Sequence, residues 1–98
     1  MDNKSELEAR IPIAVMAALK RYLNDGVHPG GFLSAVLRND LLATYERADL
    51  HSREAMPHLM TYLYNYVPAR AFGSPEAVED WTAERRRAMM NAGGNPIS

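Results

Sequence analysis

Apolar residues return every three or four positions along most of this chain, the spacing that places them on one face of an α-helix. The first such run follows Pro12, a residue suited to the first turn of a helix because its missing N–H would have no partner there. The run ends near Asp25, and Gly26 supplies the left-handed stop that commonly closes a helix. These positions predict a first helix over residues 12–25.

The second run is the most apolar of the chain and extends from about Gly30 to Arg47. At about 1.5 Å per residue it predicts one helix roughly 27 Å long. Such an apolar helix is expected to be covered by its neighbours or by another subunit. Asp40 lies on the apolar stripe, where an unpaired carboxylate would be costly to bury. We therefore expect a partner for it, either Arg70 or backbone N–H groups in the loop around Phe72.

Two further helices are predicted in the second half of the chain. The third begins at Asp49 or Ser52, either of which can cap it. Pro57 inside this run predicts either a start after Ser52 or a kink. The fourth begins at Ser74–Glu76, where a cap, a first-turn proline and an acid follow one another, and it ends at the glycine pair 93–94.

The fold class that these runs predict is all-α: a small four-helix domain with short loops, in which successive helices pack side by side and antiparallel. The sequence shows no strand-like alternation of apolar and polar residues and no internal repeat. We expect one domain over residues 11–91, preceded by a flexible segment over residues 1–10 and followed by a flexible tail over residues 92–98.

Composition narrows the classes of function. The chain has 98 residues, a net charge of -1 and no cysteine, so disulfides and thiolate metal sites are excluded. The balanced charge disfavours nucleic acid as a partner, since a binder of the phosphate backbone usually carries an excess of Lys and Arg. No apolar run approaches the roughly 20 residues of a membrane span, which predicts a cytosolic protein that binds no membrane. A chain this small buries limited surface, so self-association into a homo-oligomer would stabilise it.

A glycine pair opens the second predicted helix and makes a candidate anion site. Gly30 and Gly31 would let a ligand approach free backbone N–H groups at the positive end of the helix dipole, and His28, Lys20 and Arg21 are close enough in sequence to add charge. The alternative is that the glycines allow this turn to pack closely against a neighbouring helix. The pattern matches neither a P-loop nor a dinucleotide-binding fingerprint, and both interpretations stay open.

Other candidate ligand contacts come from aromatic and charged residues. Tyr62, Tyr66 and Trp81 are of the kind that stacks on nucleobases, although such residues are also common in cores and interfaces. Asp40, together with Asn39 and Arg38, could contact a ligand, or it could cap or brace another segment of the chain. Arg70 or one of the arginines at 85–87 would add positive charge to a ligand site.

The sequence contains no constellation typical of catalysis or metal binding. His28, His51 and His58 lack the spacing of metal ligands, and no nucleophile has a visible base. The arginines at 85–87 point in different directions around their helix and complement its carboxyl end. We therefore expect a protein that is not an enzyme, with no catalytic residue, no metal and no cofactor.

A longer sequence pattern, which includes the glycine pair and several of the candidate residues, extends from about Ile11 to Trp81. It consists of Asp25–Val27, Pro29–Leu33, Ala35–Leu37, Asn39–Leu41, Arg47–Asp49, Tyr62–Asn65, Pro68, Gly73–Pro75 and Trp81. With its PGGFLxAVLxNDL-type motif, this pattern resembles a family of short proteins of unassigned function encoded in bacteriophages and prophages. The resemblance implies a phage setting and the host cytoplasm, and it implies no reaction. Pro57 and the Gly-Gly-bearing tail depart from the family pattern.

Small phage proteins without catalytic residues often act against host defence, and this context orders the functional hypotheses. The leading hypothesis is a homo-oligomeric anti-defence protein that sequesters a phosphate-bearing, nucleotide-type signalling molecule at a subunit boundary. The alternative is an inhibitor or adaptor that binds a host or phage protein through the aromatic surface. A DNA-binding regulator is third, because the second predicted helix is too apolar to read bases in the major groove.

Overall fold

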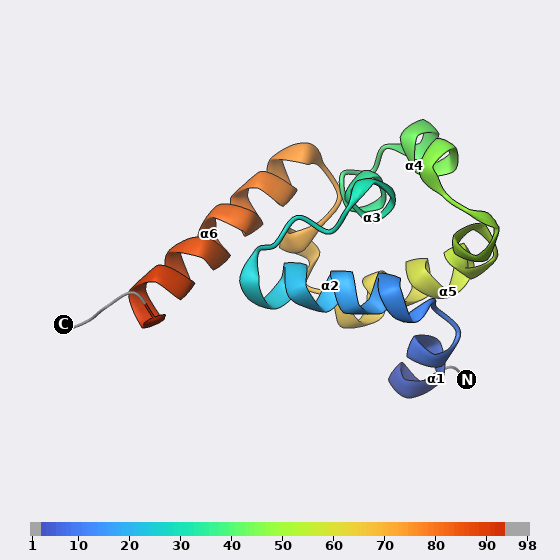
Figure 1. The fold of residues 1–98 in the computed structure, drawn as a ribbon, viewed down its shortest axis with the longest axis horizontal. Helices are drawn as coiled ribbons and strands as arrows, with labels where there is room; N and C mark the ends of the chain where they lie inside the picture. The colour runs from blue at the N-terminus through green and yellow to red at the C-terminus, as the bar shows by residue number, and fades with distance from the viewer. Residues whose placement is uncertain (1–2, 94–98) are drawn as a thin grey trace.

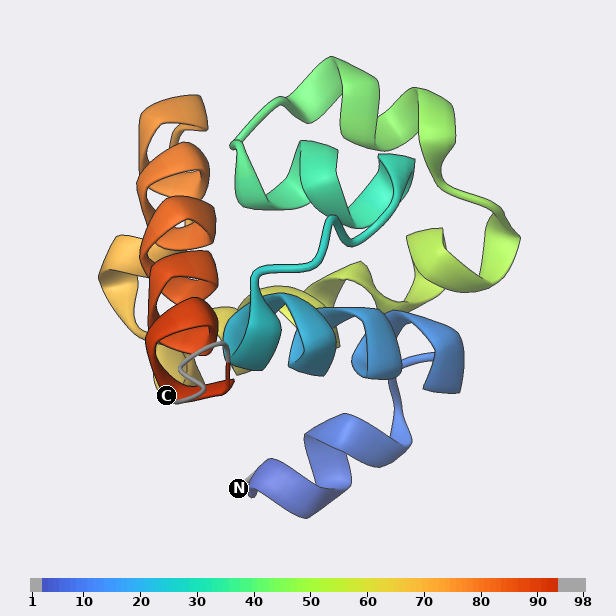
Figure 2. The same cartoon turned by 60° about the vertical axis from the view of Figure 1, so that its left-hand side comes forward.

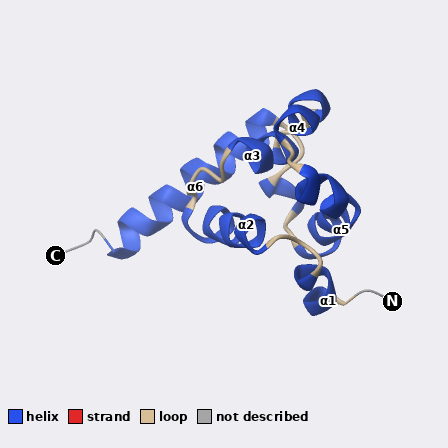
Figure 3. Cartoon of the chain, turned by 45° about the vertical axis from the view of Figure 1, so that its right-hand side comes forward, coloured by secondary structure: helices blue, strands red, loops and turns tan. Residues whose placement is uncertain are grey.

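The computed structural model of this protein describes residues 3–93, which fold into six α-helices and one 3₁₀-helix (Figure 1). The residues described include no strand, so the all-α fold class is confirmed (Figure 3). Six helices are present where four were expected, and the antiparallel packing of successive helices stays a prediction. None of the described helices has the length and apolar character needed to cross a lipid bilayer. In chain order the elements are α1 (Lys4–Ala9), α2 (Ile13–Asp25), α3 (Gly31–Leu37), α4 (Leu41–Arg47), α5 (Leu50–Tyr66), η1 (Ala69–Ala71) and α6 (Pro75–Gly93).

The first additional helix, α1, lies in the segment expected to be flexible. The Asn3 side chain caps it by accepting a 2.8 Å hydrogen bond from the Glu6 N–H, and the Glu6 carboxylate accepts one from the Asn3 N–H in return. Leu7 is fully buried in the core, and α1 packs against α5 and α2. The expected flexible segment is therefore wrong for residues 3–10, whereas residues 1 and 2 lie outside the described part of the chain.

The first predicted helix is present as α2 and ends, as expected, at Gly26. This glycine has a φ of +71°, and its N–H donates to the Tyr22 carbonyl at 3.0 Å. It is buried against α6, where a Cβ at this position would lie 3.0 Å from both the Thr82 carbonyl oxygen and the Arg85 Cβ. Glycine therefore provides both the left-handed turn and the close approach of α2 to α6.

The second additional helix arises because the predicted helix over residues 30–47 is divided into α3 and α4. In the turn between them Asn39 has a φ of +63°, a left-handed conformation that asparagine tolerates better than most residues. The Asp40 N–H donates to the Ala35 carbonyl at 2.9 Å and closes α3. The Asp40 carboxylate accepts from the Ala43 N–H at 3.1 Å and opens α4. Two consecutive residues thus end one helix and start the next.

The third predicted helix is α5, and its start corrects the expectation about Pro57. Asp49 caps the helix by accepting a 2.8 Å hydrogen bond from the Ser52 N–H, so the helix begins at Leu50 and not after Ser52. Pro57 lies inside the helix at an exposed position, where it removes one backbone hydrogen bond of the helix. The expected start after Ser52 is therefore wrong, and a kink at Pro57 stays a prediction.

One hydrophobic core unites the helices. Leu7, Leu19 and Tyr22 are fully buried in it, and the Tyr22 hydroxyl donates to the Ala71 carbonyl at 2.7 Å. This bond satisfies the polar end of the largest fully buried side chain and connects η1 to α2. The other large side chains that are fully buried are Leu33, Leu37, Leu59 and Leu63.

α6 packs across the end of α2 and then extends away from the rest of the molecule (Figure 1). α3 and α4 lie against each other (Figure 2). Val78 and Trp81 in the first half of α6 are buried, whereas Met89 in its second half is half exposed. α6 continues to Gly93, inside the range expected to be a flexible tail. Residues 94–98 of that expected tail lie outside the described residues.

Candidate functional site

The structure separates the expected ligand-binding residues into three groups. The groups are, first, His28, Gly30, Gly31 and Asp40 around α3 and α4; second, Arg70 and Trp81 where η1 meets α6; and third, Tyr62 and Tyr66 on α5. Of the first group, His28, Gly31 and Asp40 border a hollow that none of the expected aromatic residues lines. Within one chain, therefore, the start of α3 and the aromatic side chains do not share a hollow, and their meeting at a subunit boundary stays a prediction.

An open hollow of about 320 Å³ lies between α3 and α4, and we call it the α3–α4 hollow. Arg38, which was grouped with Asp40 from the sequence, and Arg47, which was not considered there, also line it. They meet there because the turn at Asn39 brings α4 back alongside α3, so the Asn39–Asp40 pair is the sequence signal that could have found them. The principal lining residues are His28, Gly31, Ser34, Arg38, Asp40 and Arg47.

The two glycines at the start of α3 have different roles. The Gly30 N–H donates to His28 Nδ1 at 3.1 Å, so it is already engaged and the proton of the neutral imidazole lies on Nε2. At Gly31 a Cβ would lie 2.8 Å from Arg47 Nη1 and 3.2 Å from its Cδ. The close-packing alternative is therefore what the structure shows at Gly31, and the residue packed against it is an arginine that lines the hollow.

Positive charge exceeds negative charge around the α3–α4 hollow. Arg38 and Arg47 pair with no carboxylate of the described chain, in which the two ion pairs involve other cations. The Nε of Arg38 is buried and has no hydrogen-bond acceptor among the described residues. A buried donor of this kind is a costly feature unless a partner satisfies it. The hollow thus presents two unpaired guanidinium groups and one imidazole against the single carboxylate of Asp40 among its described lining residues.

Asp40 does not have the partner that was expected. Its side chain is exposed and caps α4, so of the roles considered for it capping is the one observed. Arg70 pairs instead with Glu84, with 2.8 Å between Nη1 and Oε1. The loop after η1 is held by α3, because the Gly73 N–H donates to the Leu37 carbonyl at 2.7 Å.

Trp81 belongs to the core and is not available to stack on a base. Only 7% of its surface is exposed, and its indole N–H donates to the Tyr22 carbonyl at 3.3 Å. The guanidinium carbons of Arg70 and Arg85 lie 5.2 and 5.4 Å from its ring centroid. The Trp81 ring is thus already in cation–π contact with two arginines of the same chain. The expectation that Trp81 contacts a ligand base is therefore wrong.

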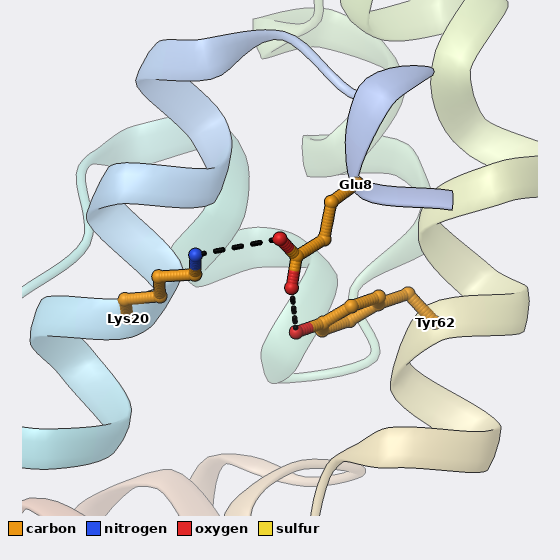
Figure 4. Close-up of polar contacts among 3 residues, drawn as sticks. All are labelled: Glu8, Lys20 and Tyr62. Carbon is orange, nitrogen blue, oxygen red and sulfur yellow. Dashed lines mark hydrogen bonds and ion pairs between the residues drawn. The ribbon is translucent and has the colours of Figure 1, made fainter. Parts of the chain in front are cut away.

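Tyr62 is also a core residue. It is 4% exposed, and its hydroxyl donates at 3.0 Å to a Glu8 oxygen whose partner oxygen lies 3.5 Å from Lys20 Nζ (Figure 4). Burial, reinforced by this bond, raises the pKa of Tyr62 to about 12, and the bond holds the pKa of Glu8 below its usual value. Tyr66 is 40% exposed, with its ring centroid 5.5 Å from that of Tyr62. Of these two tyrosines only Tyr66 keeps an exposed ring surface.

α4 carries an exposed apolar surface, which was expected from the sequence to be covered by neighbouring helices or by another subunit. Leu41, Leu42 and Tyr45 are 77%, 76% and 62% exposed. We call these three residues the α4 surface. The Arg53 guanidinium lies 4.3 Å from the Tyr45 ring centroid and borders an apolar hollow of about 250 Å³ next to this surface. Large apolar side chains gathered in this way commonly mark an interaction surface.

The described residues hold no cluster of three or more His, Asp or Glu side chains that could bind a metal ion. No protein-family model, curated protein or solved structure matches this chain. The resemblance to phage proteins therefore stays a prediction, and function has to be argued from the residues of the chain itself.

Proposed function

We propose that this protein is a binding protein without catalytic activity that holds a phosphate-bearing small molecule in the α3–α4 hollow. The observation that carries the proposal is the pair of guanidinium groups, Arg38 and Arg47, that line the hollow without a carboxylate partner in the described chain. Arginine presents a planar fork of donors that matches phosphate oxygens, and such charge-assisted hydrogen bonds are about twice as strong as neutral ones.

The other lining residues suit a ligand with both anionic and neutral polar parts. His28 adds an N–H donor at Nε2, since its Nδ1 accepts from Gly30. The Gly31 N–H at the first turn of α3 adds another donor, with no acceptor assigned to it in the described chain. Asp40 keeps a second carboxylate oxygen that can accept from a ligand hydroxyl or amino group. These partners fit a nucleotide-type molecule, of which the phosphate would meet the arginines.

The geometry also supports self-association close to the hollow. One side of α4 lines the hollow through Ala43 and Arg47, while its exposed side carries Leu41, Leu42 and Tyr45. A homo-oligomer formed through the α4 surface would place the hollow next to the subunit boundary and would cover apolar side chains that water now contacts. In the host cytoplasm of an infected cell, such a protein would sequester a nucleotide signal of antiviral defence.

Removal of the Arg47 guanidinium tests this function. We expect the protein purified from phage-infected cells to release a phosphate-bearing species when native mass spectrometry is followed by mild denaturation. Arg47→Gln should lose most of this species because one charge-assisted contact is worth about 1.5–3 kcal/mol. Gly31→Ala should have the same effect, since its methyl group would displace the Arg47 side chain while leaving helix content intact.

Arg21→Gln is the matched control, because Arg21 is exposed on α2 and lines no described hollow near α3. It should retain the bound species at the wild-type level. Equal retention by Arg47→Gln, or a wild-type protein that releases no phosphate-bearing species, would show that the hollow does not hold such a ligand.

A second candidate function is a protein-binding inhibitor or adaptor, and the α4 surface is the observation that favours it. Three of the seven residues of α4 are large, apolar and more than half exposed. In a complex with a host or phage protein these side chains would form the buried centre of the interface. This function needs no small ligand.

The double substitution Leu41→Ser with Leu42→Ser tests whether the α4 surface mediates self-association or binds another protein. We expect it to convert an oligomeric wild type to a monomer in size-exclusion chromatography with light scattering, with unchanged helix content because both side chains are exposed. Ile13→Ser is the control, since Ile13 is 88% exposed on α2. A wild type that is already monomeric, but loses a defined captured protein on the double substitution, would favour the second function.

A further inference from the structure

A second hollow adjoins the first. It has a volume of about 380 Å³ and lies between the segment before α3 and the first half of α6, and we call it the α3–α6 hollow. His28 and Arg38 line both hollows, so their side chains form the boundary between the two. The two hollows therefore lie next to each other, on either side of these two side chains, and we call the pair of them the trough.

Cationic groups are distributed along the whole trough. Arg47 lines its α4 end, Arg38 lies at the middle beside the neutral imidazole of His28, and Arg86 lines its α6 end. Neither Arg38 nor Arg47 nor Arg86 has a carboxylate within ion-pair distance in the described chain. One acidic residue also lines each end, Asp40 at the α4 end and Glu79 at the α6 end.

Arg38 is placed to serve two anionic groups at once. Its guanidinium fork carries five N–H donors, and its buried Nε has no acceptor among the described residues. Because Arg38 borders both spaces, one phosphate in each hollow would lie beside it. The α3–α6 hollow also has apolar lining from Pro29, Val78 and Ala83, which suits an uncharged body between two charged groups.

We infer that the trough takes a small molecule with two phosphate groups, one held between Arg38 and Arg47 and the other between Arg38 and Arg86. This inference rests on the proposed function, because it keeps the α3–α4 hollow as the first phosphate site. It adds the second site and the class of ligand: a bisphosphate whose phosphates are separated by an uncharged body such as a nucleoside.

Calorimetric titration with two commercial probes tests the second site. Adenosine 3′,5′-bisphosphate carries two separated phosphates, and adenosine 5′-monophosphate carries one. The wild type should bind the bisphosphate at least about tenfold more tightly, because the second phosphate gains a charge-assisted contact. Arg86→Gln should remove this preference and leave monophosphate binding unchanged. Arg87→Gln, an exposed neighbour that lines neither hollow, should keep the preference.

The outcomes distinguish the second site from the first. Equal affinity of the wild type for both probes, no binding of the bisphosphate, or an Arg86→Gln effect no larger than that of Arg87→Gln overturns the two-phosphate inference. If the wild type binds the monophosphate and Arg47→Gln does not, the result would still support the α3–α4 hollow as a phosphate site. The native mass spectrometry experiment decides the proposed function independently of both probes.

Discussion

Glu8 connects three helices through one carboxylate. It lies on α1, accepts a hydrogen bond from the Tyr62 hydroxyl of α5 and pairs with the Lys20 ammonium of α2. Beside this contact, α1 is held by the burial of Leu7. Because the hydrogen bond from Tyr62 lowers the pKa of Glu8, the folded chain favours the ionised carboxylate over the neutral acid.

We predict that this contact stabilises the fold at neutral pH and that its contribution disappears in acid. Since folding lowers the pKa of Glu8, the stabilisation is present above the ordinary carboxyl value of 4.5 and is lost as the pH falls through the lower folded pKa. The free energy of unfolding in urea should therefore differ between wild type and Tyr62→Phe at about pH 7, and the difference should shrink towards about pH 3.

Tyr64→Phe is the matched control for this measurement, because Tyr64 is 85% exposed on the same helix. It should have the stability of the wild type at both pH values. A difference between wild type and Tyr62→Phe that stays constant across the acid range would mean that the Glu8 carboxylate does not contribute through this bond.

Caps and turns, as much as apolar spacing, decide where the elements of this chain begin and end. Gly26, Asp49 and Ser74 were recognisable in the sequence, and each bounds a helix in the structure. α1 could not be found from spacing, because Leu7 is its one buried residue and a single residue has no period. The turn at Asn39 was missed because the apolar stripe continues in register on both sides of it.

The contribution of α1 to the core can be measured with one substitution. Leu7→Ala removes a fully buried side chain and should lower the free energy of unfolding by about 2–5 kcal/mol, the range for such a cavity. Ile13→Ala on an exposed position should change it by no more than about 0.5 kcal/mol. Urea unfolding followed by circular dichroism gives both values. A Leu7→Ala cost as small as that of Ile13→Ala would show that α1 adds nothing to the stability of the core.

At the scale of the whole molecule, apolar surface is exposed in several places, and α4 and the outer half of α6 are two of them. Leu41, Leu42 and Tyr45 on α4 and Met89 and Met90 on the outer half of α6 are all at least half exposed. Figure 1 shows these two parts of the molecule well apart, with the core helices between them. Burial of such surface in a complex would be favourable, and both proposed functions therefore involve a partner, either a second copy of the chain or another protein.

Which site residues come together in space depends on how far apart they lie along the chain. His28 and Gly31 are close in sequence, so their association at one hollow was predictable, whereas Asp40 and Arg47 join it through the turn at Asn39, which was missed. Trp81 and Tyr62 bond to groups 59 and 54 residues away, and no local pattern encodes such pairing. Their assignment to a ligand therefore failed, because a single sequence does not tell a core aromatic residue from an exposed one.

Gly26 has a consequence for how this chain can change over many generations. Its positive φ disfavours every residue with a side chain, and the Cβ of any such residue would also lie too close to α6. A second substitution cannot relieve the contact, since one of the two obstacles is the backbone carbonyl of Thr82, which every residue at that position retains. The apolar positions can drift among leucine, isoleucine and methionine, but this one has no neutral alternative. Diverged relatives should thus be recognisable by a glycine at this place after most other identities have been lost.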